Sequence, residues 1–184
     1  ISSKANISDK AVIEGNVVIE DGVRVFEYAV VKGPCHIGKG CVIGNGALIR
    51  GGVELGDGCI VGSEVKHSYL GSNVGSHQNY VGDSIIMDGC NLGAGTRTAN
   101  WRFDGQPVKV KIGADKVSTG MEKFGCIMGE NSKTGINVSI MPGVKIGPNS
   151  IVGPHLLVSQ DVGPGRFVAL KCAVEEAENR QAKQ

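Results

Sequence analysis

Aliphatic residues recur at every sixth position of the chain, and glycine or polar residues fill many of the positions between them. In the first third the series runs Ile7, Ile13, Ile19, Val25, Val31, Ile37, Ile43, Ile49, Leu55 and Val61. The same register returns late, at Met128, Thr134, Ile140, Ile146, Val152 and Val158. A period of six matches neither the 3.6 residues of a helical turn nor the alternation of a long strand. It predicts short strands joined by tight corners, with the aliphatic residue pointing inward.

Three such hexads would close one triangular coil, and each coil would stack on the previous one by parallel backbone pairing. The pattern resembles the hexapeptide-repeat family of left-handed parallel β-helices; the left hand is implied by that resemblance alone. We therefore expect an all-β chain with a left-handed β-helix over residues 1–170. A short C-terminal helix is expected in the tail, residues 171–184.

Two segments interrupt the six-residue period. The phase slips between 67 and 87, in a polar, glycine-rich stretch that contains His77-Gln78-Asn79-Tyr80. Between 96 and 125 the period vanishes, and the segment holds the only Trp and several Lys and Arg residues. A loop of this length in a compact domain is usually functional or disordered. We expect an inserted loop that favours an anionic ligand.

Composition excludes several functional classes. Gly accounts for 29 of 184 residues without a G-X-Y triplet, and no run of 18 apolar residues occurs, so neither a collagen nor a membrane-spanning protein is expected. The net charge of +1 argues against binding nucleic acid by counterion release. The chain begins at Ile1 within a pattern already in progress. We expect a domain of a longer polypeptide.

Among residues able to do chemistry, the cysteines and most histidines have structural explanations. Five of the six cysteines stand two positions before an inward aliphatic residue, where a small buried side chain is expected. His77 lies instead in the polar break, and a neutral histidine is the commonest general base at physiological pH. No two histidines are five residues apart, as the zinc ligands of a γ-class carbonic anhydrase would be. We therefore expect no metal site.

The segment from Arg50 to Gly105 resembles the acetyltransferase domain of the bifunctional enzymes that make UDP-N-acetylglucosamine, in particular their archaeal branch. The resemblance rests on the motifs Leu48-Ile49-Arg50-Gly51-Gly52, Glu64-Val65-Lys66, His77-Gln78-Asn79-Tyr80-Val81-Gly82-Asp83, Asn91-Leu92-Gly93-Ala94-Gly95-Thr96 and Asn100-Trp101-Arg102-Phe103-Asp104-Gly105. It implies His77 as the catalytic base. The substrate-binding residues that it implies are Arg50, Lys66, Tyr80, Asn91 and Asn100. The residues implied to contact acetyl-CoA are Ala94, Asn100, Trp101, Lys109 and Lys171.

The activity implied by the resemblance is N-acetylation of an amino-sugar 1-phosphate, with glucosamine-1-phosphate as acceptor and acetyl-CoA as cosubstrate. It also implies a cytoplasmic homotrimer with sites between subunits, and a nucleotidylyltransferase domain preceding residue 1. Two alternatives stay open: the same reaction on galactosamine-1-phosphate, and a non-catalytic β-helix that trimerises or regulates a sugar nucleotidylyltransferase. Fold by itself does not decide between them.

Overall fold

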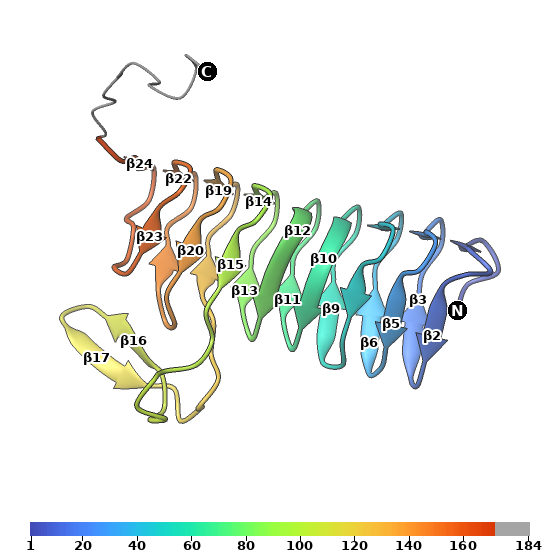
Figure 1. The fold of residues 1–184 in the computed structure, drawn as a ribbon, viewed down its shortest axis with the longest axis horizontal. Coiled ribbons are helices and arrows are strands. Elements are labelled where there is room, and N and C mark those ends of the chain that lie inside the picture. Colours follow the sequence, from blue (N-terminus) through green and yellow to red (C-terminus); the bar gives the residue numbers. More distant parts are fainter. Residues whose placement is uncertain (172–184) are drawn as a thin grey trace, which may run out of the picture.

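The computed structural model describes residues 1–171, and they form a parallel β-solenoid whose coils stack along its long axis (Figure 1). Where the repeat is regular, successive partners are 18 residues apart, as are Val25, Ile43 and Val61. Three ladders of short strands run along the stack, and the hexapeptide period fits the left-handed form of this fold. Within residues 1–171 there is no helix; the helix expected over 171–184 lies, from residue 172 on, outside the described residues.

The first ladder contains nine strands, which are β1 (Asn6–Ile7), β4 (Arg24–Val25), β7 (Val42–Ile43), β10 (Ile60–Lys66), β12 (Gly75–Gly82), β14 (Asn91–Leu92), β19 (Lys133–Thr134), β22 (Ile151–Val152) and β24 (Phe167–Val168). The second ladder is a separate sheet of β3 (Val17–Ile19), β6 (Cys35–Ile37), β9 (Val53–Leu55), β11 (Tyr69–Leu70), β13 (Ile85–Ile86), β18 (Ile127–Met128) and β21 (Lys145–Ile146). The third ladder joins β10 and β12 to β2 (Val12–Glu14), β5 (Val30–Lys32), β8 (Leu48–Ile49), β15 (Arg97–Thr98), β20 (Ser139–Ile140) and β23 (Leu157–Val158).

The core is the column of aliphatic side chains predicted from the period of six. Ile37, Ile43, Ile49 and Leu55 are each fully buried. Ile43 and Ile49 lie in two-residue strands whose other residues, Val42 and Leu48, are only partly buried. The small positions, such as Cys41 and Ala47, are buried at the corners. Burying this mostly aliphatic column, in which hydroxyl side chains such as Ser76 and Thr134 take a few inward positions, is the main stabilising contribution in such a stack.

The phase slip predicted between 67 and 87 is confirmed as a change in the shape of the coil. Strands β10 and β12 belong to both the first and the third ladder, because each runs straight through a corner that the other coils turn. The coil from Val61 to Ser76 takes 15 residues and the next, from Ser76 to Leu92, takes 16. A buried hydrogen-bonded group of Ser63, Ser76 and Asn79 fills this corner. The sequence segment expected to carry function thus lies on the two modified coils.

The inserted segment leaves the solenoid after Ala99 and rejoins it at Gly125. Arg97–Thr98 lie within the range 96–125 that the sequence predicts as a loop, but they form strand β15 of the third ladder. The excursion contains an antiparallel hairpin of β16 (Lys109–Ile112) and β17 (Asp115–Ser118). Figure 1 shows this hairpin projecting from the side of the solenoid in its C-terminal half.

Candidate active site

A cluster of polar side chains joins the ends of β10 and β12 to the start of the inserted segment. The carboxylate of Asp83 is at its centre, with only 6% of the side chain exposed. Asp83 Oδ2 lies 2.5 Å from Asn100 Nδ2 and 3.7 Å from Lys66 Nζ, and Asp83 Oδ1 lies 3.5 Å from His67 Nδ1. The Lys66 side chain is itself only 12% exposed. Three residues expected to bind substrate, Lys66, Tyr80 and Asn100, meet in this cluster.

The hydrogen bonds of Asn100 fix which atom it can offer to a ligand. An ionised carboxylate only accepts hydrogen bonds, so the Asn100 atom facing Asp83 is the amide nitrogen. The same nitrogen donates to the Tyr80 hydroxyl at 3.2 Å. Both side-chain amide hydrogens are therefore engaged within the protein, and the side-chain oxygen Oδ1 of Asn100 is left as an acceptor.

Tyr80 belongs to this cluster and lies on β12, between strands β10 and β15. Its backbone is opposite Glu64 on β10 and Arg97 on β15. Partial burial raises the pKa of the Tyr80 phenol above its usual value, although the hydrogen bond from Asn100 acts in the opposite direction. The phenol is therefore neutral at physiological pH and can donate its proton to a ligand oxygen.

Arg50 lies beside the cluster on the adjacent coil. The backbone N–H of Arg50 donates to the backbone carbonyl of Val65 at 2.8 Å. This hydrogen bond places Arg50 next to Lys66 across the strand pair β8–β10. The Arg50 guanidinium contacts Glu64 Oε1 at 3.0 Å and remains 48% exposed. Two cations at neighbouring levels of the stack can hold a phosphate by charge-assisted hydrogen bonds.

His77 and Asn91 line a separate hollow of about 340 Å³ on β12 and β14. His77 is exposed and lies opposite Gly62, three residues before Tyr80 on the same strand. Gln78, the next residue, has a φ of 54° in the straightened corner. The structure thus separates the expected site residues into two groups, with His77 and Asn91 on one side of the corner and Tyr80 with Lys66 and Asn100 on the other.

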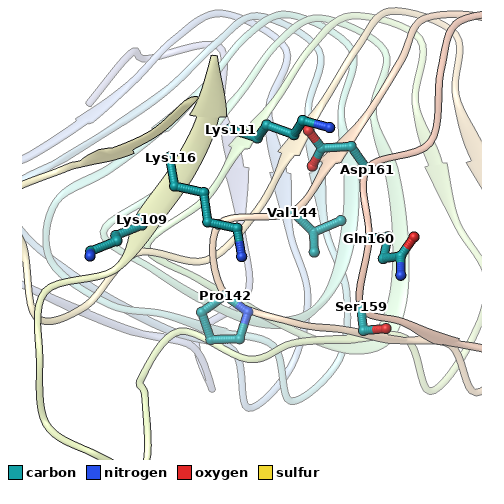
Figure 2. A pocket seen from close by; sticks show the side chains of 9 residues that line it. Lys109, Lys111, Lys116, Pro142, Val144, Ser159, Gln160 and Asp161 are labelled. Atoms are coloured by element: carbon teal, nitrogen blue, oxygen red, sulfur yellow. The ribbon is translucent and has the colours of Figure 1, made fainter. Parts of the chain in front are cut away.

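The residues expected to contact the cofactor are spread along the C-terminal half. Ala94 is exposed at a coil corner, and among the hydrogen bonds within residues 1–171 none uses its N–H. Trp101 lines a cavity of about 420 Å³ with Phe103 and Met141. Lys109 borders a second cavity of about 350 Å³ under the hairpin (Figure 2). Lys171 is exposed beyond β24 and lines none of these hollows.

The sequence indicated no individual role for several residues that the structure places at these sites, although Lys111 and Lys116 belong to the inserted loop that is expected to favour an anionic ligand. Asp83 and His67 complete the polar cluster, and Lys111 and Lys116 border the cavity under the hairpin. Asp83 follows Tyr80 within the polar break, so its position in that break was the available signal. Its contacts with Lys66 and Asn100, each 17 residues away along the chain, were not visible without the fold.

Two further properties concern the part of the chain that the structure describes. Over residues 1–171 no group of three or more His, Cys, Asp or Glu side chains comes together that could hold a metal ion. The same residues contain no helix that could cross a lipid bilayer.

Sequence comparisons match this chain to one protein family and to several similar proteins. The family described as bacterial transferase hexapeptide (six repeats) matches residues 16–51, 34–66 and 125–160. A protein of Methanococcus vannielii named bifunctional protein GlmU is 47% identical over 169 residues, which are 90% of this chain and 41% of the relative. A protein of Sulfurisphaera tokodaii named bifunctional sugar-1-phosphate nucleotidylyltransferase/acetyltransferase is 47% identical over 106 residues, 56% of this chain and 26% of the relative.

Among solved structures, the UDP-N-acetylglucosamine acyltransferase from Campylobacter jejuni has the same fold, with a TM-score of 0.53 at 15% identity. That alignment covers 90% of this chain and 69% of the other. The chain spans 41% of the length of the Methanococcus vannielii relative, so the match concerns only that part of the relative.

Proposed function

Starting from a chain that belongs to the hexapeptide-repeat proteins and is related to the archaeal GlmU proteins, we propose that it is an acetyltransferase acting on an amino-sugar 1-phosphate. The acceptor we propose is glucosamine-1-phosphate and the donor is acetyl-CoA. Both are cytoplasmic metabolites, so we place the reaction in the cytoplasm. The observation that carries the proposal is the polar cluster of Lys66, Tyr80, Asp83 and Asn100 beside Arg50.

The cluster suits an acceptor that carries both a phosphate and an amine. Arg50 and Lys66 would hold the anomeric phosphate, and fixing it there would position the amine for reaction. The Tyr80 hydroxyl and Asn91 would orient the sugar ring. A coil that serves only as a scaffold has no need for a buried lysine paired with a buried carboxylate, since burying two charges costs free energy.

In the reaction, the amine nitrogen would attack the thioester carbonyl of acetyl-CoA. A C–N bond forms, the C–S bond breaks, and the nitrogen gives up a proton to His77. The thiolate of coenzyme A leaves and takes up a proton, for which the protonated His77 is a source. A positioned base of this kind contributes about 10²- to 10⁴-fold in rate.

Asn100 and Ala94 would act on opposite sides of this reaction. The side-chain oxygen Oδ1 of Asn100 can accept a hydrogen bond from the attacking amine, while the side-chain amide hydrogens are donated to Asp83 and Tyr80. Polarising the thioester carbonyl needs a donor instead. The N–H of Ala94 could supply one. In the sequence expectation Asn100 contacts both the amino sugar and acetyl-CoA, whereas this division gives it a contact with the amine and leaves the thioester carbonyl to Ala94.

His77 and the polar cluster lie on either side of one corner, so a single subunit exposes the site without enclosing it. We propose a homotrimer in which the neighbouring subunit closes this side, as the resemblance implies. The oligomeric state can be measured by analytical ultracentrifugation in the same preparation that is assayed.

The proposed function is tested by measuring thiol release from acetyl-CoA with glucosamine-1-phosphate, and in parallel with galactosamine-1-phosphate. Release that depends on the glucosamine compound supports the proposal. A higher kcat/KM for the galactosamine compound would show that galactosamine-1-phosphate, and not glucosamine-1-phosphate, is the preferred acceptor. No release with either sugar, from a folded and trimeric sample, would favour a non-catalytic β-helix.

A further inference from the structure

The cavity under the hairpin is bordered by the basic face of β16 and β17 on one side and by coil corners on the other. Its lining includes Lys109, Lys111 and Lys116 from the hairpin and Pro142, Ser159 and Asp161 from the coils. Figure 2 shows Lys111 extending toward Asp161 and Lys116 toward Pro142, whereas Lys109 extends away from Asp161. Two ammonium groups therefore overlie a hollow of about 350 Å³.

The two lysines are placed where their charges repel. Lys111 and Lys116 are direct cross-strand partners in the hairpin register. Like charges directly opposite on a two-stranded ribbon are destabilising, and such a ribbon is only marginally stable to begin with. In the described residues neither ammonium forms an ion pair with a carboxylate. An anionic ligand between them would remove the repulsion.

The acidic residue in the cavity is already neutralised. Asp161 Oδ2 lies 3.5 Å from the ammonium nitrogen of Lys145, and Asp161 Oδ1 accepts a hydrogen bond from the backbone N–H of Lys145 at 2.9 Å. The Lys145 ammonium also donates to the backbone carbonyl of Lys111. The charge that remains at the cavity is therefore positive, and it comes from Lys111 and Lys116.

The hairpin is held against the coil at its base, so the cavity is a feature of the fold. Val108, directly before β16, is 1% exposed. Gly143 has a φ of +78° and faces the carbonyl of Lys109 so closely that a Cβ there would lie 2.3 Å from that oxygen. Only glycine permits this approach without displacing the hairpin.

The cavity under the hairpin adjoins the cavity that Trp101 lines. Both are bordered by Pro142 and Ser159. The second is lined mainly by apolar side chains, among them Phe103 and Met141, and its remaining charged residues, Arg102 and Asp104, form an ion pair with each other. From Asn100 outward, the surface thus presents a polar cluster, then apolar side chains, then the two lysines. Acetyl-CoA has a matching order of groups: a thioester, a pantetheine arm in which methylene and methyl groups are interspersed with two amides, and a set of phosphates.

We propose that Lys111 and Lys116 form a binding site for the phosphate groups of the acetyl donor, with the apolar cavity at Trp101 holding its arm. The proposal rests on the proposed function for the identity of the donor. The shared chemistry is a phosphoester anion, and inorganic phosphate or a free nucleotide would satisfy the lysines in the same way. The experiment has to separate these sources.

The test compares the double variant Lys111→Gln/Lys116→Gln with the wild-type chain in two assays. Equilibrium binding of coenzyme A, measured calorimetrically without an acceptor sugar, should weaken by about 10-fold or more, because the loss of even one charge-assisted hydrogen bond removes about that factor. The KM for acetyl-CoA should rise similarly. Turnover of S-acetyl-N-acetylcysteamine, a short thioester without phosphates, should be unchanged. Lys133→Gln, an exposed lysine on β19, is the matched control and should leave both assays at wild-type values.

Several results would overturn the proposal. One is unchanged coenzyme A affinity in the double variant; another is an equal loss of activity with acetyl-CoA and with the short thioester. Inorganic phosphate or 3′,5′-ADP that binds to the lysines without competing with coenzyme A would make this a separate anion site. If no donor is turned over but the double variant still loses coenzyme A affinity, the proposed function fails and the phosphate site stands.

Discussion

Replacing Asp83 with Asn tests whether the buried carboxylate organises the polar cluster. Asp83 has a φ of 51°, a backbone conformation that Asn adopts readily, so the substitution introduces no backbone strain. The amide oxygen can still accept the hydrogen bond from Asn100. What is lost is the negative charge facing Lys66 and His67.

The expected magnitude follows from the burial of Lys66. Removing one partner of a fully buried ion pair typically costs about 3–5 kcal/mol. Here the Asp83–Lys66 distance is 3.7 Å, the lysine retains 12% exposure, and the Asn100 contact survives. We therefore expect a loss of about 1–3 kcal/mol in the free energy of unfolding. Because Lys66 loses its charged partner and shifts in the site, kcat/KM for the amino sugar should fall by about 10- to 100-fold.

The assay is urea unfolding together with steady-state kinetics for each substrate. A positioning role predicts a higher KM for the amino sugar and a lower kcat, while the KM for acetyl-CoA stays constant. The control is Asp57→Asn, an exposed corner carboxylate that accepts the Lys39 N–H at 2.7 Å, which should leave the kinetics unchanged. A wild-type KM for the sugar in Asp83→Asn would refute the reasoning.

Three further outcomes are expected. In the thiol-release assay, His77→Ala should lower kcat by about 10²- to 10⁴-fold, with little change in thermal stability. The control His36→Ala, which removes a surface contact with a glutamate, should keep wild-type kinetics. Burial raises the pKa of Cys90 to about 11 and that of Cys126 to about 12, so both thiols remain protonated at pH 8. We expect them to react with a disulfide reagent only after unfolding. Fast labelling of the native protein would contradict this. Ile43→Ala, in a fully buried position of the aliphatic column, should reduce the free energy of unfolding by about 2–5 kcal/mol in urea titrations, and a change below about 1 kcal/mol would argue against a close-packed column.

The period of six was sufficient to predict the solenoid. An inward aliphatic residue at every sixth position specifies which side chains are buried, and the observed burial of Ile43, Ile49 and Leu55 follows that rule. The period also located the modified coils, because shortening a corner shifts every later inward position. Likewise, the loss of the period marked the inserted segment to within a few residues. These features are local, so the sequence alone determines them.

The tertiary structure decided which polar side chains meet. Asp83 contacts Lys66 and Asn100 because straightened corners bring residues from three successive coils to one point. The sequence could not show that both amide hydrogens of Asn100 are engaged, and this changes the role proposed for that residue. Nothing in the alternation of Val108 to Ile112 indicated that the hairpin would face coil residues near Gly143.

The physical reason for this division is the range of the interactions. Inward and outward positions in a repeat are set by neighbours a few residues apart, and so a sequence pattern records them. The path of the inserted segment is set by the burial of Val108, the hydrogen bond from Gly125 to the Asp83 carbonyl, and the contact of Lys145 with the hairpin backbone. Those contacts join residues 34 to 42 positions apart, and they exist only once the coils have stacked.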